Sequence, residues 1–274
     1  MSALIAFLSD YGLDDEFVGV CHAVMFSVAP DARVIDLTHG IAPHDVRGGA
    51  LALSRAVQYL PDETVVLAVV DPGVGTDRKP IAVRAGSYFF VGPDNGVLSP
   101  AVAIVGGATE SVVLDSTEHR LPAAGGATFD GRDVFAPAAA FLAVGTPLST
   151  IGSPVSAAEL VPLLLPLTGE RPDGGLQSQV LWVDRFGNAQ LNVDPDELEQ
   201  LDLRPGSAVE VEFDDGNARD LRWLSAYGEA DVDELVLIVD SYGLLSVARN
   251  RGRAVDVVPL GPGAPVTLRR PRPE

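Results

Sequence analysis

The chain is 274 residues long, 47% of them hydrophobic, and it carries a formal net charge of −19 at pH 7. This length can bury one large core or two smaller ones, and we expect two domains. The acidity excludes a nucleic-acid partner, because binding to a phosphate backbone requires clustered Lys and Arg.

Strand-like and helix-like patterns alternate in the first half. Buried strands are expected at residues 3–8, 34–37 and 64–70. Helices are expected at 16–28 and 45–59, the second with Asp45 as its N-cap. This β-α-β-α-β order predicts a largely parallel sheet flanked by helices. Shorter strand-like runs follow at 81–84, 88–91, 102–105 and 112–114, and a last helix is expected at 133–144.

The second half has a different pattern. A Pro-rich stretch at 153–175 is interpreted as a linker. Beyond it, strand-length runs without a strong helix recur at 179–183, 208–213, 235–239, 244–247 and 255–258. We therefore predict an N-terminal α/β domain over 1–152 and a smaller C-terminal antiparallel, β-barrel-like domain over 176–274.

Cysteine content and hydropathy favour a soluble, cytoplasmic protein with no membrane partner. Cys21 is the only cysteine, which excludes an intrachain disulfide and a cysteine metal cluster. The N-terminus lacks the basic region of a signal peptide, and the most apolar later stretch, 134–144, is shorter than the ~20 residues of a membrane span. The four histidines are not spaced like metal ligands, so we expect no metal site. They are His22, His39, His44 and His119.

Three apolar runs of the first half, 4–9, 34–35 and 65–70, stop directly before an aspartate: Asp10, Asp36 and Asp71. Asp10 and Asp71 follow the two longer runs. Because α/β proteins bind ligands at the carboxyl ends of parallel strands, both side chains are candidates for a binding crevice. Asp10 can accept hydrogen bonds from the vicinal hydroxyls of a ribose; alternatively, it belongs to an N-cap cluster for the following helix. The chain has no dinucleotide fingerprint, Walker loop or Gly-x-Ser-x-Gly elbow.

Asp71 and Arg78 are seven residues apart across a glycine-containing turn. Pairing would keep the carboxylate ionised, and an ionised carboxylate beside a water can orient that water as a nucleophile. The alternative is a structural ion pair that braces the loop. Asp130 and Asp133 precede an apolar helix, where either could serve only as a cap.

Polar clusters interrupt the strands of the second half at 184–188, 240–243 and 249–251. Phe186 offers a flat apolar face for a base, and Asn188 offers an amide that both donates to and accepts from a heterocycle edge. Alternatively, each cluster only forms a turn, in which Gly187 and Gly243 adopt a positive φ.

Six segments in chain order carry a resemblance to a known family: 7–12, 71–75 with Arg78, 92–96, 128–133, 184–188, and 241–243 with Arg249 and Asn250. They resemble the S-adenosyl-L-methionine (SAM) hydrolase (adenosine-forming) family, also called SAM hydroxide adenosyltransferases, which is related to fluorinase and chlorinase. The resemblance implies hydrolysis of SAM to adenosine and L-methionine by in-line attack of water at C5′, without a cofactor. It also implies a homotrimer whose sites lie between the N-terminal domain of one subunit and the C-terminal domain of the next.

The resemblance assigns roles to individual residues. Asp71 and Arg78 match two members of the water-activating set, and Asp10 matches the acceptor of the ribose hydroxyls. The other matching positions bind substrate: Phe129 and Gly131 near C5′, Asp184 and Ser241 at the methionine end, Phe186, Asn188, Arg249, Asn250 and Arg251 at the adenine end, Tyr227 as a second aromatic surface, and Tyr242 beside Ser241.

One catalytic position departs from the family pattern. The usual Thr-Phe-His-Gly-Arg-Asp has a histidine where this chain has Asp130. A second carboxylate would repel Asp71 unless Arg78 separates the two or one acid is protonated. Two alternatives to hydrolysis stay open: halide transfer to C5′, which an ionised Asp71 disfavours, and a catalytically weak binder of adenosine or SAM.

Overall fold

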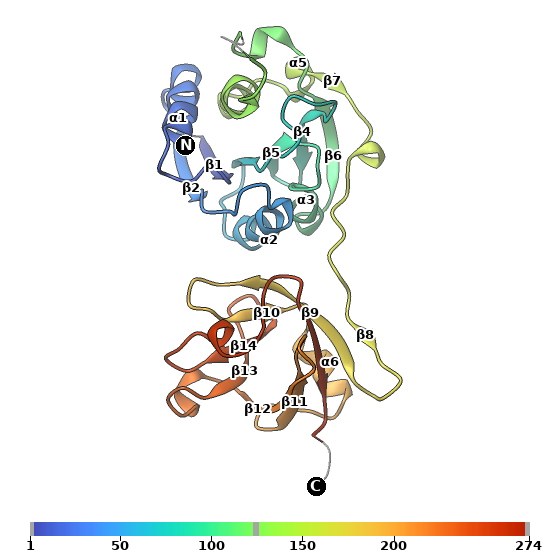
Figure 1. The fold of residues 1–274 in the computed structure, drawn as a ribbon. Coiled ribbons are helices and arrows are strands. Elements are labelled where there is room, and N and C mark those ends of the chain that lie inside the picture. The colour runs from blue at the N-terminus through green and yellow to red at the C-terminus, as the bar shows by residue number, and fades with distance from the viewer. Residues whose placement is uncertain (1–2, 123–125, 272–274) are drawn as a thin grey trace. The chain divides into compact units, whose positions relative to one another are not determined.

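The computed structural model describes residues 3–122 and 126–271, and the chain divides into two compact units, Met1–Leu164 and Leu165–Glu274 (Figure 1). The division falls within the stretch that was expected as a linker. Over the described ranges, no helix is long and apolar enough to cross a membrane.

A sheet of seven strands, counted over the described residues, forms the centre of the N-terminal unit in the order β2-β1-β3-β5-β4-β6-β7. The strands are β1 (Leu4–Ser9), β2 (Arg33–Thr38), β3 (Val65–Val69), β4 (Pro80–Ala85), β5 (Tyr88–Pro93), β6 (Ala108–Val113) and β7 (Ser153–Pro154). The first four in this order are parallel, whereas β4, β6 and β7 pair antiparallel. A tight turn at Gly86, with φ +54°, makes β4 and β5 a hairpin. The predicted α/β class is confirmed, with an antiparallel edge added to the parallel strands.

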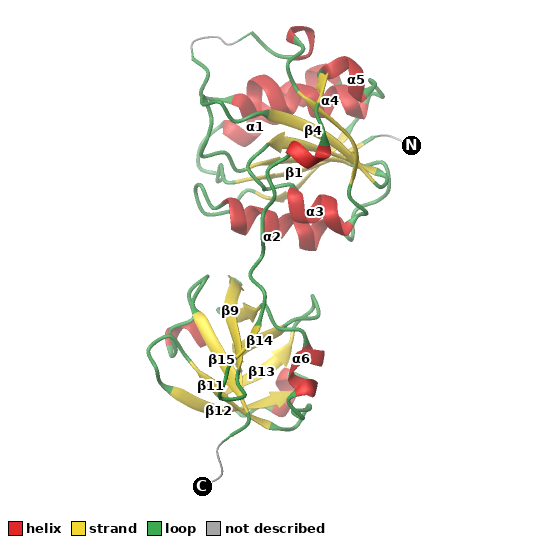
Figure 2. Ribbon diagram, turned by 90° about the vertical axis from the view of Figure 1, so that its right-hand side faces the viewer, coloured by secondary structure: helices red, strands yellow, loops and turns green. Residues whose placement is uncertain are grey.

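Helices cover both faces of this sheet (Figure 2). On one face lie α1 (Phe17–Val28), the π-helix η2 (Gly131–Phe135) and α4 (Ala136–Ala143); on the other lie α2 (Val46–Val57) and α3 (Ser99–Ile104). Because both faces are covered, β1 and β3 are apolar along almost their whole length. Asp45 caps α2 as predicted and accepts from the Gly48 N–H at 2.8 Å. Shorter helical segments are η1 (Thr117–His119), α5 (Leu148–Ile151) and η3 (Ala157–Glu159).

The C-terminal unit is a β-barrel. Seven strands of its described residues follow one another in the order β10-β14-β13-β12-β11-β15-β9, and β9 pairs with β10 to close the barrel, while β8 extends the edge of β9. Their bounds are β8 (Gly169–Glu170), β9 (Leu176–Val183), β10 (Ala189–Leu191), β11 (Ala208–Glu212), β12 (Ala218–Leu224), β13 (Leu235–Val239), β14 (Leu245–Arg249) and β15 (Pro265–Arg269). The pair β12 and β13 is parallel, and the other pairings are antiparallel. The predicted barrel-like domain is confirmed, and its interior packs around Trp223 and Leu191.

Two local strand predictions are wrong. The run 102–105 lies in and after α3, and the run 255–258 overlaps the 3-10 turn η5 (Ala254–Asp256). Short, mostly apolar runs of four residues do not distinguish a buried strand from a buried helical turn. The barrel also contains the helix α6 (Pro195–Gln200) and the turn η4 (Tyr227–Glu229). α6 begins with a capping box made by Asp194 and Glu197, a signal that the sequence does contain.

Candidate active site

The carboxyl ends of β1 and β3 form a topological switch point. The two strands are adjacent and parallel. The connection from β1 leads to β2 on one side of β1, whereas the connection from β2 leads to β3 on the other side of β1. Divergent connections of this kind leave a crevice at the edge of the sheet. Asp10 follows β1 and Asp71 follows shortly after β3, and both line a cavity of about 750 Å³ within the N-terminal unit.

Asp71, Arg78 and Asp130 form a charge cluster at this cavity. The Arg78 Nε donates to the two carboxylate oxygens of Asp71 at 2.9 and 3.0 Å, and its Nη2 donates to Asp71 Oδ2 at 2.5 Å and also to Asp130 Oδ2. The side chains of Arg78 and Asp71 are only 10% and 7% exposed. One guanidinium therefore bridges two carboxylates and offsets the repulsion expected from the sequence.

Arg78 keeps its charge in this environment. Burial alone lowers the pKa of the guanidinium, but the hydrogen bonds to Asp71 and Asp130 outweigh burial and hold the pKa above its usual value. The Arg78 Cζ also lies 5.2 Å from the centroid of the Phe135 ring. With both carboxylates ionised, the cluster has one net negative charge.

Asp130 is presented by the start of the π-helix η2. It occupies the N-cap position but makes no side-chain cap hydrogen bond, and its carboxylate pairs with Arg78 instead. Asp133 is buried and receives two hydrogen bonds from Arg132, at 2.7 and 2.8 Å. The interpretation of these two acids as helix caps is therefore wrong. π-Helical turns are rare and occur often at functional sites.

Gly131 leaves room for the phenol of Tyr11. A Cβ added at Gly131 would overlap Tyr11 Oη and lie 2.9 Å from its Cζ. Tyr11, Phe17 and Phe129 line the same cavity, with ring centroids between 5.1 and 5.8 Å apart. Burial, and then the nearby Cys21 and Asp10, raise the pKa of the Tyr11 phenol, so the hydroxyl stays protonated.

Asp10 is held by the backbone of the neighbouring loop. Its Oδ2 accepts from the N–H of His44 at 2.8 Å, and His44 has the unusual φ of +68°. The N-cap of α1 is Glu16, which makes no side-chain cap bond, so the N-cap alternative for Asp10 is wrong. No described residue donates to Asp10 Oδ1, which leaves that oxygen available for a hydroxyl group.

A second cavity, of about 600 Å³, lies within the C-terminal unit. The residues that line it include seven of the predicted substrate-binding set: Asp184, Phe186, Asn188, Tyr227, Arg249, Asn250 and Arg251. Asp184 fixes the loop by accepting from the backbone N–H and from the Nδ2 of Asn188, each at 2.9 Å. Phe186 is 75% exposed. Ser241 and Tyr242 lie in the turn between β13 and β14, outside the described lining of this cavity.

Sequence reasoning missed Tyr11, Phe17 and His44 as cavity residues. Tyr11 directly follows Asp10 near the end of β1, which was a usable signal, whereas Phe17 lies beyond the loop at the start of α1. His44 reaches the cavity through a loop conformation that no local pattern predicts.

Comparisons with known proteins agree with the motifs. Family models of the SAM hydroxide adenosyltransferase N-terminal and C-terminal domains match residues 5–152 and 178–267. The chain is 45% identical to a protein of Salinispora tropica named (R)-S-adenosyl-L-methionine hydrolase, covering 94% of this chain and 95% of the relative. A fluorinase of Actinopolyspora mzabensis is 30% identical, with 90% of each chain covered. The crystal structure of an uncharacterized conserved protein from Thermotoga maritima is similar with a TM-score of 0.88 at 34% identity, covering 96% of this chain and 99% of that one. The resemblance that the sequence motifs carry is therefore confirmed, and the chain belongs to the SAM hydroxide adenosyltransferase family.

Proposed function

We propose that this chain hydrolyses SAM to adenosine and L-methionine; its Salinispora tropica relative is named (R)-S-adenosyl-L-methionine hydrolase. The observation that carries the proposal is the Asp71–Arg78–Asp130 cluster at the cavity of the switch point. One net negative charge favours a cationic sulfonium substrate, and it opposes an incoming halide.

The proposed reaction is an in-line (SN2) displacement at C5′. A water held by Asp71 forms the new C5′–O bond while the C5′–S bond breaks, and the bonding electron pair leaves with the sulfur of methionine. The water loses one proton to a carboxylate of the cluster, which passes it to solvent. Because a sulfonium is already a good leaving group, the protein need mainly align the water and exclude solvent, and alignment can supply up to about 7–11 kcal/mol. The balanced reaction needs no cofactor.

The remaining site residues bind substrate in this proposal. Asp10 accepts from the ribose hydroxyls, since its Oδ1 has no donor among the described residues. Phe129 and Gly131 border C5′. The C-terminal set binds the two ends of SAM: Phe186, Asn188, Tyr227, Arg249, Asn250 and Arg251 at the adenine, and Asp184, Ser241 and Tyr242 at the methionine.

We also propose a cytoplasmic homotrimer, with sites shared between subunits as the family resemblance implies. Light scattering on the eluting protein should give three times the chain mass of 28.7 kDa. A monomer with full activity would contradict shared sites.

Asp130 has a different role in this proposal from the histidine of the family pattern. It accepts from Arg78, so it helps to fix the guanidinium that holds Asp71. We expect Asp130→His to lower kcat about ten-fold, since Arg78 would lose a carboxylate partner. A higher kcat would mean that the carboxylate at position 130 slows hydrolysis relative to a histidine there.

Product analysis tests the function directly. The purified chain is incubated with SAM in water enriched in the heavy oxygen isotope, with and without chloride, using each sulfonium epimer because the relative's name specifies (R). We expect the isotope in the 5′-hydroxyl of adenosine and none in methionine. Formation of 5′-chloro-5′-deoxyadenosine would instead identify halide transfer, and saturable SAM binding without product would identify a passive binder.

A further inference from the structure

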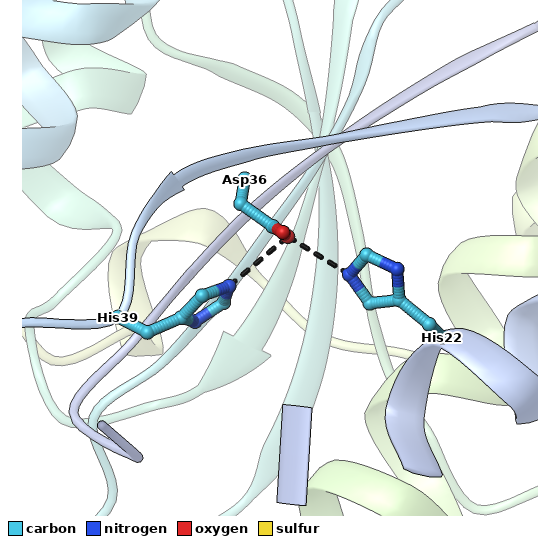
Figure 3. Close-up of side chains that lie close together, drawn as sticks. All are labelled: His22, Asp36 and His39. Atoms are coloured by element: carbon cyan, nitrogen blue, oxygen red, sulfur yellow. Dashed lines mark hydrogen bonds and ion pairs between the residues drawn. The ribbon is translucent and has the colours of Figure 1, made fainter. Parts of the chain in front are cut away.

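Two histidines and an aspartate converge in the N-terminal unit, outside the described lining of the cavity that holds Asp71 (Figure 3). His22 lies on α1, Asp36 on β2, and His39 directly after β2. The Nε2 atoms of His22 and His39 lie 2.8 and 3.0 Å from the same oxygen, Asp36 Oδ1. In Figure 3 the two rings approach the carboxylate from either side. All three potential ligand atoms lie within 4.8 Å of one another.

His39 supplies the most buried nitrogen of the cluster. Its side chain is 2% exposed, and its Nδ1 lies 2.7 Å from Ser9 Oγ. Its Nε2 is close to Asp36, but it has no aligned hydrogen-bond partner among the described residues. This contact with Asp36 is misaligned, and a misaligned contact satisfies a buried nitrogen less well than a straight hydrogen bond.

The donor set suits a borderline transition-metal ion. Two imidazole nitrogens and one carboxylate oxygen are a set of three protein ligands found in open zinc sites, at about 2.0–2.2 Å from the ion. Around a tetrahedral ion such ligand atoms are about 3.4 Å apart, so the two N–O pairs would separate by about half an ångström, and the two nitrogens, which lie within 4.8 Å of each other, would take up the same spacing. His22 and Asp36 can make this adjustment because their side chains are 34% and 41% exposed. Mg²⁺ disfavours nitrogen ligands, which excludes it.

Ser9 provides the support that a metal-binding histidine needs. When the His39 Nδ1–H donates to Ser9 Oγ, the Nε2 carries a lone pair directed toward the other two groups. Such hydrogen bonds behind the ligand fix its tautomer and orientation.

We propose that His22, Asp36 and His39 form an open zinc site, with water as the fourth ligand on the exposed side. The ion would join α1 to β2 and so stabilise the N-terminal unit. No metal site was expected from the sequence, because the histidines are not spaced like metal ligands along the chain. Spacing cannot detect ligands that a helix, a strand and a loop bring together in space. This inference does not depend on the proposed hydrolysis.

Metal titration of the tag-free full chain tests the site. Chelator-treated protein is titrated with Zn²⁺ by calorimetry and with Co²⁺ by visible absorption. We expect one saturable equivalent per chain, Co²⁺ bands typical of tetrahedral coordination, a higher thermal midpoint with Zn²⁺, and no saturation with Mg²⁺. His22→Ala and Asp36→Asn should each weaken Zn²⁺ binding at least about ten-fold, since even supporting residues contribute that much. His119→Ala is the matched control and should bind as the unmodified chain does.

Two outcomes would overturn the site. One is the absence of a saturable Zn²⁺ equivalent. The other is an affinity that neither His22→Ala nor Asp36→Asn changes, in variants whose metal-free thermal unfolding shows that they are folded. Either result would leave the three side chains as an ion-paired cluster only.

Discussion

Each unit buries an arginine among carboxylates, and the two clusters differ in their relation to the two cavities described above. In the barrel, the Arg269 Nε lies 2.8 Å from Glu210 Oε1, and its Nη1 lies 2.9 Å from Asp173 Oδ2. Arg269 also pairs with Glu212. Arg269 and Glu210 face each other across β15 and β11, and the described lining of the C-terminal cavity includes no member of this cluster. In the N-terminal unit, Asp71 and Asp130 border open space.

The difference shows that buried ion pairing alone does not mark a site. Perturbed or paired charges occur in structural networks as well as in active sites. What distinguishes Arg78 from Arg269 is a cavity of substrate size beside its carboxylates. The substitutions below test whether this distinction separates chemistry from stability.

Asp71→Asn should have the largest effect. The amide keeps the shape of the side chain but cannot take up the proton of the attacking water. We expect kcat for adenosine formation to fall about 10²–10⁴-fold, the usual contribution of a general base. The matched control is Asp31→Asn, an exposed carboxylate before β2, which should leave kcat unchanged. An unchanged kcat in Asp71→Asn would remove Asp71 from the mechanism.

Arg269→Ala should affect stability rather than chemistry. Removing one partner of a buried ion pair costs about 3–5 kcal/mol, and we expect about 2–3 kcal/mol here because Asp173 and Glu212 are partly exposed. Urea unfolding measures the loss, and kcat of the folded variant should equal that of the unmodified chain. A folded variant with a much lower kcat would show that the barrel cluster also serves the reaction.

The sequence predicts the parts of the molecule that local patterns determine. β1 and β3 are predictable because strands buried on both faces are continuously apolar, and their order along the chain places Asp10 and Asp71 at one edge. The pairing of Asp130 with Arg78 spans 52 residues, and it entered through the family resemblance rather than through spacing. The cluster of His22, Asp36 and His39 depends on how α1 packs against β2, which no spacing rule captures.

Gly131→Ala tests how tightly the cavity wall is packed. The new methyl group would overlap Tyr11 Oη, and overpacking of this kind costs about 1–3 kcal/mol. Adding Tyr11→Phe should recover part of the loss, because it removes the atom nearest the new methyl. Gly19→Ala is the control: nothing lies within 4 Å of its added Cβ, and in the first turn of α1 the change should be neutral or up to about 1 kcal/mol stabilising. Equal stability of Gly131→Ala and the unmodified chain would contradict the contact.

Phe186→Ala should have the smallest effect and should act on binding alone. Phe186 is largely exposed, so its loss should not change the free energy of unfolding. If its ring stacks on adenine, losing the stack costs about 1 kcal/mol or somewhat more, which raises KM for SAM roughly five- to ten-fold. Because adenine is far from the reacting bond, the interaction is equal in ground and transition states and kcat should hardly change. The control is Phe26→Ala, an exposed phenylalanine on α1 that lies outside the described lining of both cavities, and its KM should not change. A lower kcat in Phe186→Ala would mean that the barrel contributes to the chemical step, and an unchanged KM would remove its cavity from substrate binding.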